Sequence, residues 1–272
     1  MSDYNRNIGT APFGRAVGHT VAVDEGLRAY MLRVYNYMTL GLAITGLAAL
    51  GIYLLAVTGE MAAAAKIMRN GVEIPARIAG NMYLTPLGYY VFISPLKWVI
   101  MLAPLAMVFV LSFGILRMRP ALAQLTFWIF AALMGLSLSA IFLVFTHTSI
   151  VRVFFITAAS FGALSLWGYT TQRDLSSMGS FLMMGLFGVI LASLINLFMA
   201  SSALQFAISV IGVLVFAGLT AWDTQRLKSE YLYGAMDGDT AERSAINGAL
   251  SLYLNFINLF TLLLQLLGQR EQ

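Results

Sequence analysis

Residues 245–267 read AINGALSLYLNFINLFTLLLQLL, a run that is long and apolar enough to form a helix across a lipid bilayer. Polar residues recur in this run every three or four positions, so on an α-helix they share one face. They are Asn247, Ser251, Asn255, Asn258, Thr261 and Gln265. A polar face towards lipid would leave amide groups without hydrogen-bond partners. We therefore expect it to face inward, towards other helices or water.

The composition of the whole chain is that of an integral membrane protein. Of its 272 residues, 60% are hydrophobic and only 10% are charged, whereas soluble domains carry about 25% charged residues. The net charge of +4 comes from basic residues that stand singly at the ends of apolar runs. This arrangement is typical of topology signals and argues against binding of nucleic acid. The chain has no cysteine, which excludes disulfides, thiol catalysis and cysteine-ligated metals.

Seven apolar runs of about 20 residues predict an all-α membrane protein with seven transmembrane helices. The runs cover residues 34–57, 96–116, 121–144, 150–171, 181–200, 204–222 and 245–267. Together they define a transmembrane domain over residues 34–268. The preceding segment, residues 1–33, is polar, contains several glycines and lacks the early apolar stretch of a cleavable signal peptide. We expect it to be a flexible arm whose last part, residues 23–33, forms a short amphipathic helix on the membrane surface.

Two of the expected connections are long. Residues 58–95 are mixed in character and contain glycines and prolines, and residues 225–244 are polar with an acidic second half. The short connections on one side of the membrane are all basic, and most Lys and Arg residues lie on that side if the N-terminus is cytoplasmic. The sequence therefore predicts a cytoplasmic N-terminus, with Asp223 near the cytoplasmic membrane face.

Asp223, in the sequence GLTAWDTQRLKSEY, is the acidic residue best placed to reach the polar face of the last helix. A carboxylate at the bilayer centre costs about 2.5–3.5 kcal/mol, so such groups usually face a cavity and have a partner. One interpretation is an interfacial Asp paired with Arg226, three residues along the same helix. The other is a titratable gate, or a transient ligand for calcium, because protonation of such a group can move a helix. The sequence leaves both open.

Other polar residues carry weaker signals. Asn255 and Asn258 could join helices by hydrogen bonds, line a pore, or place the last helix centrally among the other six. Asp174 is either a solvated loop residue or part of a salt bridge that closes the inner face. The basic residues that could form ion pairs at this face are Arg117, Arg119, Arg173 and Arg226.

Small residues are spaced for close packing of two helices. Ala131, Gly135 and Ser139 repeat every four positions, as do Ala158 and Gly162. This spacing lets helix backbones approach one another in lipid. At both places we expect tight helix packing.

The sequence offers no sign of catalysis. Its only histidines are His19 and His147, and neither is expected inside a helix. An intramembrane serine protease needs a base beside its nucleophile, and the chain contains no G-x-S-x-G, H-E-x-x-H or P-loop motif. We therefore expect no enzymatic activity and no cofactor, and the sequence identifies no small-molecule substrate.

Three stretches in the C-terminal half form a distinctive set. They are LSLWGYTTQRDLSSMGSFLMMGLFGVILASLINLF (164–198), QFAISVIGVLVFAGLTAWDTQRLKSEY (205–231) and GALSLYLNFINLF (248–260). The set strongly resembles the bacterial branch of the Bax inhibitor family, the transmembrane Bax-inhibitor-motif proteins. The resemblance covers about residues 164–268. It implies a seven-helix bundle in the bacterial inner membrane, with the last helix central and surrounded by the other six.

The resemblance also implies a function and a site. It implies a pH-sensitive calcium leak, in which two aspartates on the last two helices share a proton and govern closure. Asp223 matches the first of them. The second belongs to the pattern L-Y-L-D-F-I-N-L-F, and this chain has Asn255 there. An Asp–Asn pair can form a hydrogen bond without a shared proton, and the replacement also removes one charge that would attract calcium.

Two functional hypotheses follow from this resemblance. The first is a passive, pH-modulated leak for cations, calcium above all, with Asp223 and Asn255 at the inner closure. The second is a regulatory protein that binds a membrane-bound ATP-dependent protease, or other membrane proteins, during stress and needs no pore. The expected partners are the lipid bilayer in both cases, calcium in the first and the protease in the second.

Overall fold

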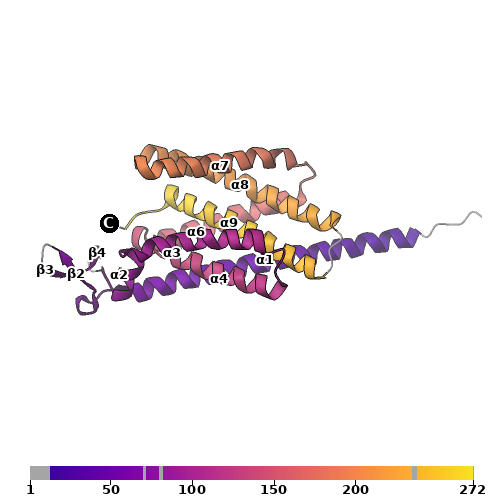
Figure 1. Ribbon diagram of the computed structural model, residues 1–272. Coiled ribbons are helices and arrows are strands. Elements are labelled where there is room, and N and C mark those ends of the chain that lie inside the picture. The colour runs from indigo at the N-terminus through magenta and orange to yellow at the C-terminus, as the bar shows by residue number, and fades with distance from the viewer. Residues whose placement is uncertain (1–12, 70–71, 80–81, 235–237, 272) are drawn as a thin grey trace, which may run out of the picture.

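The computed structural model describes residues 13–69, 72–79, 82–234 and 238–271. In this part of the chain seven helices are long and apolar enough to cross a membrane, so the predicted all-α class and the seven spans are confirmed (Figure 1). The helices that contain the spans are α1 (Phe13–Ala56), whose span is Glu25–Ala56, α3 (Leu96–Gly114), α4 (Pro120–Leu138) with the short α5 (Ile141–Val144), α6 (His147–Thr170), α7 (Ser176–Met199), α8 (Ser202–Tyr233) and α9 (Gly238–Leu267).

Several helices extend beyond their apolar runs. Helix α8 continues to Tyr233 and α9 begins at Gly238, so the expected loop 225–244 is mostly helical. His147 is the first residue of α6 and His19 lies within α1, although both were expected outside helices. Hydropathy marks only the length of chain that sits in hydrocarbon, and a helix with polar residues can continue past it.

Helix α1 also begins earlier than expected. Residues 13–33 are part of one continuous helix and not a flexible arm, whereas residues 1–12 of that arm lie outside the described residues. Leu27, Tyr30, Met31 and Val34 are buried. They follow the i, i+3, i+4, i+7 spacing of one helix face, and their burial against the bundle favours the helix over an arm.

The segment between α1 and α3 forms small antiparallel sheets at one end of the bundle (Figure 1). Strand β5 (Met82–Leu84) lies between β1 (Val57–Thr58) and β4 (Arg77–Ala79), and Val57 pairs with Leu84. Strands β2 (Lys66–Arg69) and β3 (Val72–Pro75) form a separate pair, in which Ile67 faces Ile74. A 3-10 turn, Met61–Ala63, precedes them. Thr85 then caps α2 (Pro86–Phe92) by accepting a hydrogen bond from the Gly88 amide.

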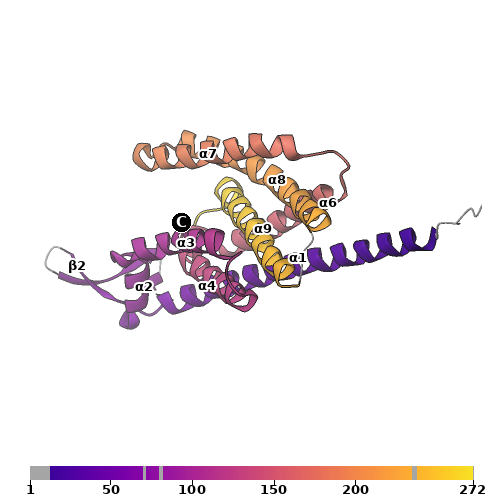
Figure 2. The ribbon, with the colours of Figure 1, turned by 45° about the vertical axis from the view of Figure 1, so that its right-hand side comes forward.

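Helix α9 is the most deeply buried span. In the most apolar 18-residue stretch of each helix, the share of buried residues is 50% for α9, 39% for α8 and 11% for α3 and α7. It packs mainly against α1, α4, α6 and α8, while α3 lies against α4 and α7 against α8 (Figures 1 and 2). Four helices, and not six, therefore form its principal surroundings.

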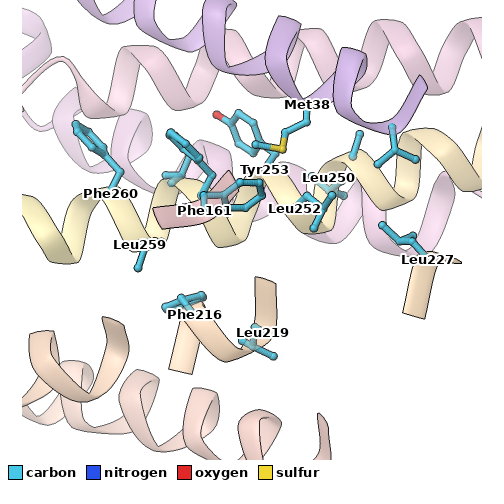
Figure 3. Close-up of a cluster of buried hydrophobic side chains, with 14 of the residues drawn as sticks. Met38, Phe161, Phe216, Leu219, Leu227, Leu250, Leu252, Tyr253, Leu259 and Phe260 are labelled. Carbon is cyan, nitrogen blue, oxygen red and sulfur yellow. The ribbon is translucent and has the colours of Figure 1, made fainter. Parts of the chain in front are cut away.

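The hydrophobic core is built around α9. Side chains of α1, α6 and α8 converge on it, among them Met38, Phe161 and Phe216 (Figure 3). Tyr253 is fully buried, and its ring packs edge-to-face against the rings of Phe127 and Phe130 from α4. Its hydroxyl is hydrogen-bonded to Thr45 of α1 at 2.7 Å. One tyrosine thus joins three helices.

The small residues pack as predicted at one place and not at the other. A Cβ atom at Gly135 of α4 would overlap the Thr45 carbonyl oxygen of α1, so these two backbones are in close contact. At Gly162 of α6 an added Cβ would meet nothing within 4 Å. The expectation of tight packing at Gly162 is wrong, because no described helix lies against that position.

The C-terminal residues fasten the end of α9 to the connection between α5 and α6. The Thr146 amide donates to the Gln269 carbonyl at 2.9 Å, and the Glu271 amide donates to the Val144 carbonyl at 3.0 Å. The Gln269 amide donates to the Ser149 hydroxyl at 2.9 Å. These bonds fix the C-terminal end of α9 against the start of α6.

Candidate functional site

Asp223 lies buried where α8 meets α9, with only 6% of its surface exposed. The Asn255 side-chain amide of α9 donates a hydrogen bond to Asp223 Oδ2 at 2.7 Å. Arg226 Nη2, one turn further along α8, forms an ion pair with Asp223 Oδ1 at 2.8 Å. Each carboxylate oxygen therefore accepts from a different donor, an arrangement that suits the ionised side chain.

Arg226 is itself held by both helices. Its Nη2 atom donates to the Ser251 hydroxyl of α9 at 3.4 Å, and its guanidinium lies over the Trp222 ring at 5.0 Å. Its Nε atom is buried and has no partner among the described residues. Gly179 of α7 allows Trp222 to lie this close, because any side chain there would overlap the indole.

This geometry bears on the two interpretations of Asp223. The ion pair with Arg226 is present, and so is the contact with Asn255 that the resemblance implies. Calcium prefers six to eight oxygen ligands. Within the described residues, no group of three or more His, Cys, Asp or Glu side chains could hold a metal ion. Asp223 is thus a single carboxylate between a cation and an amide.

A chain of hydroxyl groups lies next to Asp223, and the sequence did not reveal it. Thr224 Oγ1 of α8 is hydrogen-bonded to Ser165 of α6 at 2.9 Å, and Ser165 is hydrogen-bonded to the Tyr35 hydroxyl of α1 at 2.5 Å. The three residues lie in distant parts of the sequence, and isolated hydroxyls in apolar helices give no pattern. They connect α1, α6 and α8 beside the candidate site.

A second polar network joins the same end of α1, α8 and α9. Glu242 of α9 forms an ion pair with Arg33 at 2.5 Å and also accepts from the Tyr37 hydroxyl. Ser244 is hydrogen-bonded to Tyr30 at 2.9 Å and donates to Glu230 of α8 at 2.8 Å. These residues were missed because Glu230, Glu242 and Ser244 fall in the segment expected to be a loop.

The polar face of α9 is not the continuous inner face that was predicted. Asn255 is its only fully buried member, Asn247 and Ser251 are half-buried, and Gln265 is exposed. Asn258 donates to the Leu254 carbonyl and Thr261 to the Asn258 carbonyl, both within α9 itself. Polar side chains can satisfy themselves on their own helix backbone, so periodicity alone does not show which face turns inward.

Gln265 belongs to a cluster of amides at the far end of α8 and α9. Gln205 of α8 donates to Gln265 at 2.6 Å and accepts from Asn196 of α7 at 3.0 Å. Ser209 of α8 also donates to Gln265, at 2.9 Å. This cluster joins three helices without any ionisable group.

The other predicted inner-face residues lie apart from Asp223. Arg117 and Arg119 are exposed between α3 and α4. Arg173 is exposed, and its carbonyl accepts a hydrogen bond from Gln225. Asp174 is exposed and accepts from the Ser176 amide at 2.9 Å, and no basic side chain in the described part of the chain forms an ion pair with it. Of its two interpretations, the solvated loop residue is therefore the one that the structure supports. Hydrogen bonds from the side chain and the backbone of Ser176 hold the pKa of Asp174 below its ordinary value.

Comparison with known proteins gives a consistent result. A family model described as "Inhibitor of apoptosis-promoting Bax1" matches residues 27–272. An uncharacterized protein of Rickettsia prowazekii is 43% identical over 271 residues, which is the full length of both chains. The inner membrane protein YbhL of Escherichia coli is 40% identical over 248 residues, covering 90% of this chain and 94% of that protein. With its seven apolar helices, the chain is a multi-pass inner membrane protein and belongs to the Bax inhibitor family.

Proposed function

We propose that this protein is a passive, pH-modulated cation leak of the inner membrane, for calcium above all, and that Asp223, Asn255 and Arg226 close it. The observation that carries the proposal is the buried hydrogen bond from Asn255 to Asp223, which joins the last two helices beside an ion pair. A titratable group that connects two helices can couple its protonation state to their relative position.

The sign of the pH effect follows from the contacts. Protonation of Asp223 cancels the charge that holds Arg226, and it weakens an amide–carboxylate hydrogen bond into one between neutral groups. The α8–α9 contact is therefore tightest when Asp223 is ionised, and the leak increases as the pH falls. From α9, the cluster receives only the neutral side chains of Asn255 and Ser251, so a single carboxylate gives a gradual pH response.

Calcium would meet Asp223 only after Arg226 has moved away. One carboxylate supplies at most two of the six to eight oxygens that calcium prefers, and carbonyl groups and water would provide the others. We therefore propose transient contact and weak selectivity, not a stable calcium site.

Flux into liposomes tests this function. Purified full-length protein is reconstituted, and calcium entry is measured at pH values from about 5 to 8, the range in which perturbed carboxylates and histidine titrate. Asp223→Asn removes the titrating group, so flux should become independent of pH. Asn255→Asp restores a second carboxylate beside the first, so the pH response should become steeper. Equal pH profiles for all three proteins would contradict the closure mechanism.

The alternative function is regulation of a membrane-bound ATP-dependent protease or of other membrane proteins. One observation favours it: both oxygens of Asp223 are already paired, so the cluster could serve only to hold the bundle together. In that case the reconstituted protein passes no calcium at any of these pH values. The protein would then co-purify with a protease complex, and its cellular effect would be insensitive to Asp223→Asn.

We also propose that the N-terminus is cytoplasmic. The start of α1, the end of α8 and the start of α9 lie at the same end of the bundle (Figure 1). Basic residues gather there, as expected for a cytoplasmic face. Chemical labelling of single cysteines introduced at Arg119 and at Lys97, on opposite sides, tests this orientation in intact cells.

A further inference from the structure

A long groove runs between α1 and α6, with a volume of about 1200 Å³. Phe256 of α9 forms part of its floor and contacts the rings of Phe154 and Phe161. Gly46 of α1 and Gly162 of α6 lie on its walls, and an added Cβ at either would meet nothing within 4 Å. In a membrane such a lateral groove is filled by apolar chains, since no water is available in the bilayer core.

The two ends of the groove differ in chemistry. All of its polar side chains lie in the half that begins at Arg28, among apolar ones such as Leu32 and Leu166; they are Arg28, Tyr35, Thr39, Ser165 and Tyr169. Near its other end it is lined by Leu47, Leu50 and Phe154. An occupant must therefore be polar at one end and apolar at the other, whereas a transmembrane helix is apolar over its whole spanning length.

The charge at the polar end is positive. Arg28 is exposed on the groove wall and has no ion pair with any residue in the described part of the chain. Lys228 of α8 stands behind this end, where it donates to the Tyr169 carbonyl at 3.0 Å and lies over the Tyr169 ring at 5.3 Å. Basic groups at this depth attract anionic lipid headgroups.

The groove is about as long as a bilayer is thick. Arg28 and Leu50 are 22 residues apart on α1, which corresponds to about 33 Å along a helix. The hydrocarbon core of a bilayer is about 30 Å thick, so one leaflet accounts for about half of that distance. A lipid with its phosphate at Arg28 would therefore fill the half of the groove that begins there.

We propose that this groove binds an anionic phospholipid, with an acyl chain between α1 and α6 and the phosphate at Arg28. The site is separate from the Asp223 cluster, and lipid binding does not require that the protein conducts ions. The hydroxyl chain of Tyr35, Ser165 and Thr224 begins at the groove wall. A bound lipid would thus lie at one end of a hydrogen-bonded path to the residue that follows Asp223.

Photolabelling tests the proposal on the full-length protein in phosphatidylcholine nanodiscs. The probe is phosphatidylglycerol with a photoactivatable acyl chain, and labelled peptides are mapped by mass spectrometry. Labels should fall in residues 28–50 and 154–169, and unlabelled phosphatidylglycerol should compete better than phosphatidylcholine. Arg28→Gln should reduce this preference about fivefold, the factor for one basic side chain beside an anionic surface. Gly162→Leu should fill the groove and reduce labelling severalfold.

Matched controls separate binding from folding. Gly188→Leu introduces the same side chain at a glycine of α7 that is also open but lies outside the groove, and Arg152→Gln removes an exposed charge from the other end of α6. Both should label like the unaltered protein. Equal labelling of Gly162→Leu and Gly188→Leu, or equal competition by the two lipids, would overturn the proposal. So would a dimer that buries the groove and excludes the probe.

Discussion

Two faces of α6 carry a glycine each, and the glycines have opposite surroundings. At Gly168 a Cβ atom would overlap the Ala221 carbonyl oxygen of α8, whereas at Gly162 it would point into the open groove. The two residues are less than two turns apart on the same helix. A small residue therefore permits close packing of a second helix, but close packing occurs only where a second helix lies against that position.

The same contrast separates two sides of the molecule. The closed side comprises the interfaces of α8 with α6 and α9, where Asp223, Asn255 and Thr224 are buried and paired. The open side is the groove between α1 and α6. A change on the closed side must displace backbone or leave a polar group unpaired, whereas a change on the open side enters free space.

The largest effect should come from Gly168→Leu on the closed side. The new side chain meets the backbone of α8, which cannot move aside as a flexible side chain can, so the free energy of unfolding should fall by about 3 kcal/mol or more. Detergent-induced unfolding followed by circular dichroism measures it. Gly162→Leu is the matched control and should stay within about 0.5 kcal/mol of the unaltered protein. Similar losses of unfolding free energy in the two variants would show that the Gly168 and Gly162 faces of α6 do not differ in packing.

Asn255→Ala should have an intermediate effect. It leaves the buried Asp223 with one donor fewer, which costs about 1–3 kcal/mol of unfolding free energy. The same unfolding measurement applies, with Asn258→Ala as control, because within the described residues the Asn258 side chain donates to the Leu254 carbonyl of its own helix and to no other helix. If the two substitutions lowered the free energy of unfolding equally, the hydrogen bond from Asn255 to Asp223 would not contribute more to stability than a bond within one helix.

Ser165→Ala should have the smallest effect, because Ser165 lies on the border between the two sides. The substitution removes hydrogen bonds to Tyr35 and Thr224, and a typical hydrogen bond contributes about 0.5–1.5 kcal/mol. Tyr35→Phe removes only the bond on the groove side. A double-mutant cycle of the two variants should give a coupling energy of about 0.5 kcal/mol or more, and simple additivity would show that the two side chains act independently.

The sequence predicted the seven spans because hydropathy reports directly on the thickness of the bilayer. It did not predict that α8 and α9 continue beyond the apolar runs, nor that α1 begins at Phe13. These extensions pack through buried side chains such as Leu27 and Leu227, and such contacts depend on partners that are distant in the sequence.

The candidate site was predictable in part. The sequence predicted that Asp223 reaches the polar face of the last helix, but Asn255 as its particular partner came from the family resemblance, since the two residues are 32 positions apart and no periodicity connects them. The spacing of Asp223 and Arg226 allowed for their ion pair as one of two interpretations, and the pair is present. The remaining polar residues of α9 were misjudged, because Asn258 and Thr261 bond within their own helix. The groove could not be predicted, since an absent neighbour leaves no mark in a sequence.

Helix α9 is fastened at three heights. Glu242 and Ser244 hold its first turns, Asn255 its middle, and the strand-like bonds of Gln269 and Glu271 hold the residues that follow its end. A helix that is bonded to its neighbours near both ends and in the middle should move less than the helices around it. Movement in this protein should therefore be sought in the helices around α9, and distances measured from a label on α9 would provide a fixed frame for detecting it.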